Sequence, residues 1–431
     1  MSDGETEKDE TFNLRSYIQE LTKVCRQEFQ ETDSLEERIK IVCSKELSLA
    51  VGDLINEEGA WPRKDEELSK TNREDGNRAY NEGRYEMSIL LYTEAMKYAP
   101  CNPILLEGEA LASAAANRSA AFYQTKQYKE CIEDIEVAVS AGYPNNGLYK
   151  LYIRKCKCEL ELGRIGRAQT AFNLAVEAIE WSGLRKDMRS DLTVNLQEAF
   201  INLAKQAEED GFVFENEPDL ALREREFGLV PEKFQLQDPH PLLPAASCAI
   251  KIRYDAGVGR HVVATRDISP GEVIFVERPI VSTICDEHYE NICIVCLRYT
   301  TAPIPCPTCS EATFCTSSCQ QEALKSFHKY ECRLTHVFQQ TGINNLPLLL
   351  LAFRSIAQKP KEYFVENQEK FTVSHPKFGV EEEYLSEDYA TLFNLCTHGD
   401  RREEYDTFTK TIFACFLLRC LQGQYILVNS F

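Results

Sequence analysis

Seven cysteines and one histidine lie within the forty residues from Cys293 to Cys332, with the spacing C-x2-C-x9-C-x2-C-x5-C-x3-C-x8-H-x3-C. Eight soft ligands are the number that two tetrahedral zinc ions require. The C-x2-C pairs suit tight turns, and the C-x3-C and H-x3-C pairs put both ligands on one side of a helical turn. Disulfides or chance buried thiols explain this regular spacing less well. We predict two Zn²⁺ ions, with the ligands Cys293, Cys296, Cys306, Cys309, Cys315, Cys319, His328 and Cys332.

The rest of the chain favours a reducing compartment. Eleven of its 18 cysteines lie outside the cluster, and the acidic start, "MSDGETEKDE", is not a signal peptide. The longest apolar runs, "LPLLLLAF" and "TIFACFLL", are too short to span a bilayer. A net charge of −20 over 431 residues excludes broad attraction to nucleic acid or anionic membrane. We therefore expect a cytoplasmic or nuclear protein that binds neither nucleic acid nor membranes directly.

Residues 71–180 contain three similar stretches, each with a large residue after a turn, a small residue three positions later and an alanine seven beyond that. The sets are Tyr85/Ser88/Ala95, Tyr128/Cys131/Ala138 and Ile165/Ala168/Ala175. Small residues at these points let two helices approach closely. The pattern is that of tetratricopeptide repeats, which form stacked helical hairpins with a concave groove.

Five polar residues are expected to project from the first helices of these repeats. They resemble the dicarboxylate clamp of co-chaperone repeats, which grips the acidic C-terminal tails of heat-shock chaperones. Arg73 stands where that family usually has lysine. The alternative is that these side chains are ordinary solvated surface groups. The five are Arg73, Asn77, Asn117, Lys150 and Arg154.

The zinc cluster resembles a MYND finger. In that family the ligand pairs interleave, which implies that Cys293, Cys296, Cys315 and Cys319 hold one zinc ion and that Cys306, Cys309, His328 and Cys332 hold the other. With four protein ligands each, both sites would be closed and structural. The family generally uses this finger to dock Pro-rich peptides.

A β-rich run precedes the finger, and helical patterns follow it. This order resembles the SET and MYND domain-containing protein methyltransferases, and the leading repeats point to their branch four. The predicted fold is mainly α, with tetratricopeptide repeats followed by an incomplete mixed α/β SET domain that the finger and a helical insert interrupt. The expected segments are 1–10 (disordered), 11–66 (helical), 67–205 (repeats), 206–245 (helical tail and linker), 246–290 (first part of SET), 291–335 (MYND finger), 336–424 (helical insert) and 425–431 (start of a truncated SET core).

The resemblance implies a contact with S-adenosylmethionine at a Gly-x-Gly-Arg turn, here Gly257, Gly259 and Arg260, and near Asn429. Val258 and His261 depart from the residues usual in the family, and a plain hairpin turn is the alternative. "GQYILVNSF" resembles the opening of the family's next strand. The Asn-His-x-Cys segment and the tyrosine expected after it are not found, so we expect this chain alone to be inactive.

Two functions from different classes follow. The first is a protein-lysine N-methyltransferase that uses S-adenosylmethionine, with the repeats and finger binding proteins. The second is a non-catalytic adaptor that holds a chaperone tail through its repeats and a Pro-rich partner through its finger.

Overall fold

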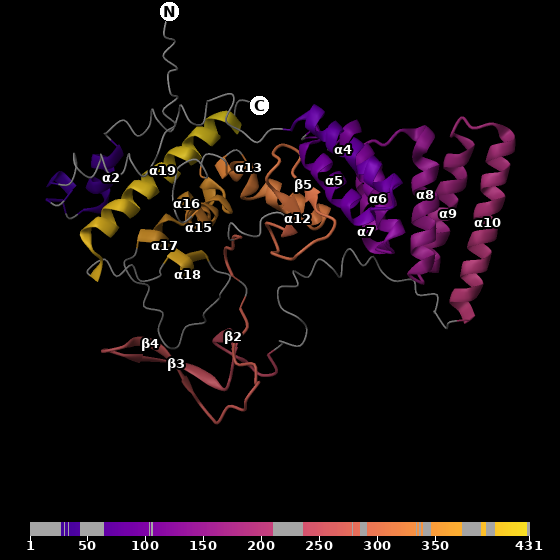
Figure 1. The fold of residues 1–431 in the computed structure, drawn as a ribbon. Helices are drawn as coiled ribbons and strands as arrows, with labels where there is room; N and C mark the ends of the chain where they lie inside the picture. The colour runs from indigo at the N-terminus through magenta and orange to yellow at the C-terminus, as the bar shows by residue number, and fades with distance from the viewer. Residues whose placement is uncertain are drawn as a thin grey trace, which may run out of the picture.

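The computed structural model describes residues 27–43, 64–209, 236–284, 291–338, 346–372, 389–393 and 401–428, without positions 30, 33, 103, 105, 106, 278, 333, 336 and 337. Residues 1–10, most of the expected helical region 11–66, residues 210–235 of the expected linker, and Asn429 lie outside this description. Helical repeats occupy one end of the molecule, the finger lies at its centre, and further helices form the other end (Figure 1).

The repeats consist of three helical hairpins. Each hairpin turn contains one residue with a left-handed backbone, namely Gly83, Lys126 and Gly163, with φ of 76°, 60° and 71°. A longer helix, α10 (Lys186–Glu209), packs beside the last hairpin. The hairpin helices are α4 (Glu66–Asn81), α5 (Tyr85–Tyr98), α6 (Glu109–Gln124), α7 (Tyr128–Ser140), α8 (Leu148–Glu161) and α9 (Ile165–Glu180).

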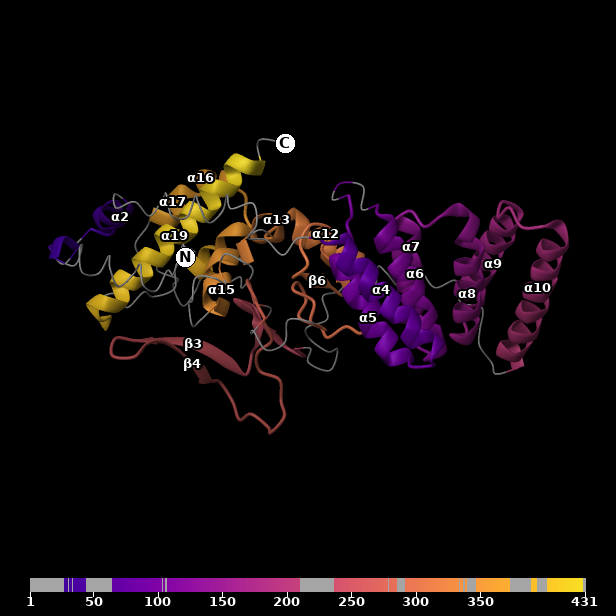
Figure 2. The same cartoon turned by 45° about the horizontal axis from the view of Figure 1, so that its top comes forward.

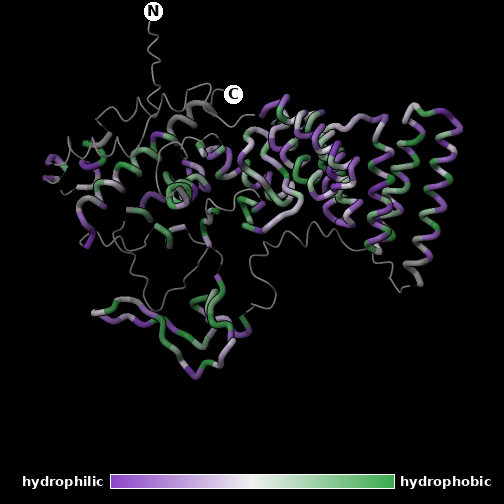
Figure 3. The backbone as a smooth tube through the Cα atoms, viewed as in Figure 1, coloured by the Kyte–Doolittle hydropathy of each residue, from purple (hydrophilic) through white to green (hydrophobic). Residues whose placement is uncertain are grey.

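Small residues lie where the helices meet. The alanines of the predicted pattern, Ala95, Ala138 and Ala175, are all fully buried. They lie on the second helices α5, α7 and α9, and hydrophobic and hydrophilic residues alternate along the hairpin helices (Figure 3). The tetratricopeptide-like architecture predicted from the sequence is confirmed.

Small antiparallel sheets follow the repeats. β1 (Pro239–His240) pairs with β2 (Leu243–Ser247), and β3 (Ile250–Asp255) pairs with β4 (Gly259–Ala264). Neither β1 nor β2 was predicted from the sequence; β1 lies in the expected linker, and β2 crosses its expected end at residue 245. In the run 271–282, expected to be β-rich, the described residues form no strand, and Phe275 makes an isolated bridge to Ala246.

The finger contains two short strands and two short helices. These are β5 (Ile304–Pro305), β6 (Thr313–Phe314), α12 (Ser317–Lys325) and α13 (His328–Glu331). Its small core includes Ile294 and Phe314 together with the buried cysteines.

The helices after the finger form a separate core with a segment from the start of the chain. The rings of Phe29 and Phe408 meet edge to face, with centroids 4.9 Å apart, and α2 (Leu35–Cys43) packs beside α19 at the end of the molecule opposite α10 (Figure 2). The helices of this insert are α15 (Leu346–Ala357), α16 (Lys361–Glu366), α17 (Gln368–Thr372), α18 (Tyr389–Phe393) and α19 (Glu404–Val428). None of the described helices is both long and apolar enough to cross a membrane.

Helix α19 corrects one expectation. Residues 425–428, expected to open a strand, continue this helix to Val428. A helix pairs its own backbone groups, whereas a strand at this point would need a neighbouring strand.

A buried ion pair joins the repeats to the finger. Arg118 of α6 donates two hydrogen bonds to the carboxylate of Asp134 on α7, at 2.7 and 2.8 Å, and both residues are at most 1% exposed. The same guanidinium donates to the Pro303 carbonyl oxygen of the finger at 3.1 Å. Ala302 and Ile304 pack into the core of the repeats on either side of it. The finger is therefore docked on the repeats by both polar and apolar contacts.

A substitution at Gly76 can test how closely the two helices of the first hairpin pack. A Cβ atom added here would lie 2.5 Å from a ring carbon of Tyr92. We expect Gly76→Ala to lower the free energy of unfolding by about 1–3 kcal/mol, because the ring must shift. In α9, Gly166 has open space around the same position, so Gly166→Ala is the matched control and should cost nothing. Urea unfolding followed by circular dichroism measures both, and equal stabilities would contradict the packing argument.

Candidate metal centre and peptide-binding face

The eight predicted zinc ligands form two clusters, grouped as the resemblance implied. Within each cluster the candidate ligand atoms all lie within 4.8 Å of one another. The all-cysteine cluster consists of Cys293, Cys296, Cys315 and Cys319, and the mixed cluster consists of Cys306, Cys309, His328 and Cys332.

The spacing of the ligand atoms fits zinc. Zn–S bonds of about 2.3 Å in a tetrahedral site hold two sulfur atoms about 3.8 Å apart. The Sγ atoms of Cys315 and Cys319 are 3.7 Å apart, and those of Cys306 and Cys332 are 3.8 Å apart. Nε2 of His328 lies 3.3 Å from the Sγ atom of Cys306 and therefore faces the mixed cluster. With all four positions of each site supplied by protein, the ions stabilise the fold and leave no position open for a substrate.

Local structure brings these ligands together. Leu297, with a φ of 58°, closes the turn after the first C-x2-C pair, and the N–H of Thr308 points at the Cys306 sulfur at 3.4 Å in the second. Cys306 and Cys315 directly follow the paired strands β5 and β6. Helix α12 begins with Thr316 as its N-cap, which accepts from the N–H of Cys319 and so orients that ligand.

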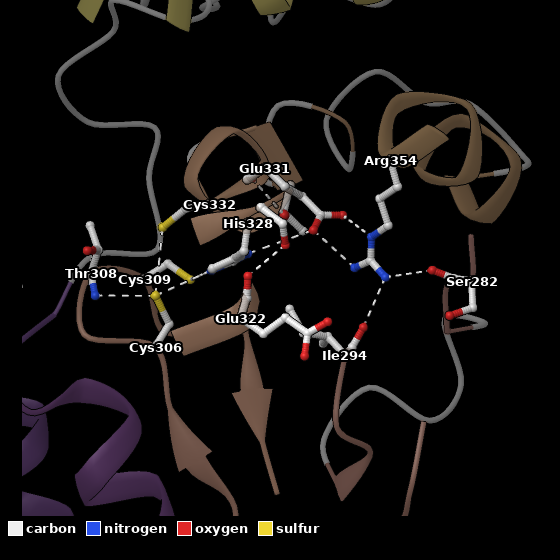
Figure 4. A network of polar contacts seen from close by, with 12 residues as sticks. Ser282, Ile294, Cys306, Thr308, Cys309, Glu322, His328, Glu331, Cys332 and Arg354 are labelled. Atoms are coloured by element: carbon white, nitrogen blue, oxygen red, sulfur yellow. Dashed lines mark hydrogen bonds and ion pairs between the residues drawn. The ribbon is translucent and has the colours of Figure 1, made fainter. Parts of the chain in front are cut away.

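The mixed cluster also has charged neighbours that the sequence did not reveal. Glu331 Oε2 lies 3.8 Å from Nδ1 of His328, the ring nitrogen that faces away from the cluster. Arg354 donates to both carboxylate oxygens of Glu331, at 2.9 and 3.0 Å (Figure 4). Burial alone would raise the pKa of Glu331, but the Arg354 guanidinium outweighs this and the pKa lies below its usual range. Glu331 is therefore an ionised, buried carboxylate.

Lys64 approaches the same cluster from the repeats. It lies just before α4 and donates to the Lys97 carbonyl oxygen at 2.7 Å. Burial lowers the pKa of Lys64, and the nearby Cys306 and Cys309 thiolates act in the opposite direction. No spacing rule links Lys64 or Arg354 to the zinc motif, which explains why the sequence did not point to them.

The five predicted peptide-binding residues lie on α4, α6 and α8, the first helices of the hairpins, which pack side by side. Asn117 Nδ2 donates to Asn77 Oδ1 at 2.9 Å across neighbouring repeats. Arg154 donates to the Ala116 carbonyl oxygen at 3.1 Å. The structure thus brings these three into one polar row, which Arg73 and Lys150 extend by one helical turn on α4 and α8.

The Gly-x-Gly-Arg turn lies at the tip of the β3–β4 hairpin. Gly259 has a φ of 79°, and the N–H of Gly257 is bonded to the Asp255 side chain at 2.9 Å. The backbone of Arg260 pairs with Tyr254 in the sheet. The structure therefore places Gly257, Gly259 and Arg260 in one hairpin, and the left-handed backbone is a sufficient structural reason for Gly259 alone. Asn429 lies outside the described residues.

Comparisons with known proteins agree with this architecture. The sequence model of the MYND finger family matches residues 293–332. A protein-lysine N-methyltransferase SMYD4 from Gallus gallus is 28% identical over 63% of this chain and 37% of its own length. Its counterparts in Mus musculus and Homo sapiens are 29% identical over 65% of this chain and 36% and 35% of their own lengths. This chain thus spans about a third of the length of these relatives.

Among solved structures, the first TPR of Spaghetti (RPAP3) bound to the HSP90 peptide SRMEEVD matches with a TM-score of 0.25 and 20% identity, over 32% of this chain and 96% of that one. Together, the fold and the two clusters define a MYND-finger protein with a tetratricopeptide-like helical region. Beyond the finger, the chain is similar to the SMYD4 protein-lysine N-methyltransferases over about two thirds of its length.

Metal content tests the two clusters directly. We expect the purified chain to hold two zinc ions and Cys309→Ser to hold one, because Cys309 belongs to the mixed cluster alone. Acid should release the zinc, since protons compete for the thiolate ligands. The control is Cys248→Ser at an exposed cysteine outside the clusters, which should keep both ions. Zinc is counted by atomic emission, and two ions in Cys309→Ser would contradict the assignment.

Proposed function

We propose that this chain is a protein-binding adaptor whose repeats hold the acidic carboxyl-terminal tail of a partner, such as a heat-shock chaperone. The contact between Asn77 and Asn117 is the observation that carries this proposal, because it joins two of the predicted residues across neighbouring repeats. Arg73, Lys150 and Arg154 add positive charge along the same first helices.

The hydrogen bonds of Asn77 suit an anionic ligand. Its Oδ1 atom accepts from both Asn117 and the Tyr92 hydroxyl group, the latter at 2.8 Å. Burial raises the pKa of Tyr92 to about 12, so this hydroxyl remains a neutral donor at physiological pH. With Oδ1 saturated, Asn77 is left with its Nδ2 hydrogens, which can donate to a carboxylate.

The finger gives the adaptor a second surface. Its strand β5 packs against α5, and Ala302 and Ile304 enter the core of the repeats. A cleft of about 1020 Å³ lies between the finger and the repeats, lined by Ile132 of α7, Gln321 of α12 and Lys325 at the end of α12. This volume is at the top of the range for small-molecule sites and suits a peptide segment. We propose that the expected Pro-rich partner of the finger binds there.

Reduced thiols are required at both zinc clusters. The proposed location is therefore the cytoplasm or the nucleus.

Charge reversal on α8 tests tail binding. A fluorescent peptide with acidic residues and a free terminal carboxylate should bind the wild type, and Lys150→Glu should weaken it at least about tenfold by replacing attraction with repulsion. The double variant Lys150→Glu/Arg154→Glu should bind still more weakly. Lys155→Glu on the same helix is the control, because Lys155 pairs with Glu136 at the surface.

A peptide with an amidated carboxyl terminus provides the second control and should bind weakly to every variant. Fluorescence anisotropy measures each affinity. Equal binding of the free-acid peptide by the wild type and Lys150→Glu would contradict the proposal.

The second candidate function is S-adenosylmethionine-dependent lysine methylation, since the aligned relatives are named protein-lysine N-methyltransferases. The alignment to SMYD4 methyltransferases over about two thirds of this chain favours it. In this role Gly257, Gly259 and Arg260 would contact the cofactor, with Asn429 nearby. We favour the adaptor for the described residues. The polar row on the first helices is joined by a hydrogen bond between neighbouring repeats, whereas the left-handed turn of the β3–β4 hairpin already accounts for Gly259 without a cofactor.

Calorimetry with S-adenosylmethionine separates the two candidates. If the hairpin binds the cofactor, the wild type should give a micromolar Kd and Gly259→Val should weaken it at least about tenfold, because valine strains the left-handed turn. Val258→Ala, at an exposed position in the same turn, should not change the affinity. A flat titration of the wild type would exclude cofactor binding by this chain.

A further inference from the structure

Arg354 links both zinc clusters to a helix outside the finger. It lies on α15, beyond the last zinc ligand, and is only 3% exposed. One side of its guanidinium group grips the Glu331 carboxylate, and its NH1 group donates to the Ile294 carbonyl oxygen at 3.1 Å and to the Ser282 carbonyl oxygen at 2.8 Å (Figure 4). The Phe327 ring covers the guanidinium group at 4.4 Å. Every side of this cation is thus engaged with the finger or with the segment that leads into it.

The two clusters receive different contacts from this group. Ile294 lies between Cys293 and Cys296, so the all-cysteine cluster is reached only through a main-chain carbonyl. Glu331 lies between His328 and Cys332, and its carboxylate faces Nδ1 of His328 at 3.8 Å. The mixed cluster therefore has the stronger electrostatic connection to Arg354.

The two ring nitrogens of His328 have different surroundings. Nδ1 is buried and has no hydrogen-bond partner among the described residues, so the Glu331 carboxylate is the polar group that it faces. Nε2 of the same ring faces the sulfur atoms of Cys306 and Cys309. The ring thus lies between the cluster on one side and the carboxylate on the other.

A carboxylate that faces the outer nitrogen of a metal-bound histidine fixes the orientation of the ring and increases its basicity, and losing such a group typically lowers metal affinity about 10- to 100-fold. Here the carboxylate is itself held by Arg354. Without that cation, Glu331 would be a buried charge with no counter-ion and could not keep its place.

We propose that Arg354 is a positioning residue for the zinc site of the mixed cluster, so that zinc retention at this site depends on α15 as well as on the finger. Residues 293–332, although they contain all eight ligands, lack the group that holds the carboxylate against the histidine. Release of α15 from the finger would loosen one zinc ion and leave the other in place.

Zinc release from the intact chain tests this proposal. A chromophoric chelator in excess reports the two ions as two kinetic phases, and Cys309→Ser identifies the phase of the all-cysteine cluster because it lacks the other site. We expect Arg354→Met to accelerate the phase of the mixed cluster about 10- to 100-fold and the other phase much less. Glu331→Gln, which preserves shape and removes the charge, should accelerate the same phase even if Arg354→Met does not fold.

A control separates positioning from general loss of stability. Ile412 is fully buried in the same core but lies on α19, so Ile412→Ala, used here in place of any substitution on α15, loosens the core without removing a group of the guanidinium network. It should change both phases alike or neither. In Co²⁺-loaded protein, Arg354→Met should alter the absorption bands of the mixed cluster, whereas Ile412→Ala should not. The proposal is overturned if Arg354→Met and Glu331→Gln leave the phase of the mixed cluster at the wild-type rate, or if they accelerate both phases equally as a destabilised core would.

Discussion

The centre of this molecule depends on metal–thiolate bonds in a segment that has little apolar material of its own. The finger core combines Ile294, Phe314 and a few other apolar side chains with the cysteine ligands. Zinc binding therefore supplies folding free energy that such a short segment could not gain from burial alone. The repeats dock on the finger through Arg118 and α15 docks on it through Arg354, so the positions of both neighbours relative to the finger depend on the folded, zinc-bound segment.

Both docking points use the same chemistry. A buried arginine is neutralised by one carboxylate and also donates to a main-chain carbonyl oxygen of the finger, that of Pro303 for Arg118 and that of Ile294 for Arg354. The planar guanidinium group suits this task because it can bind a carboxylate with two donors and still direct others elsewhere. A lysine could supply the charge but not the fixed fork. These contacts define one relative position of the finger and its neighbours, which apolar contacts alone specify less sharply.

Periodic and spaced features were predictable from the sequence. The alanines of the repeats and the eight clustered ligands show regular patterns that follow from helix geometry and from tetrahedral coordination. What the sequence could not show were contacts between distant segments, such as Glu331 with Arg354 or Arg118 with Pro303, since no spacing rule relates their positions. The end of α19 was predicted wrongly as a strand because its apolar residues suit either element, and the choice depends on whether a partner strand is present.

The contact between Phe29 and Phe408 has a consequence for biosynthesis. Nearly the whole chain separates these two rings, so the N-terminal segment leaves the ribosome long before its packing partner exists. At roughly 5–20 residues per second, the delay is on the order of 20–80 s. During this interval Phe29 and its apolar neighbours are exposed while the repeats can already fold. A nascent chain of this kind has to keep the segment around Phe29 and α2 from aggregating until α19 has been synthesised.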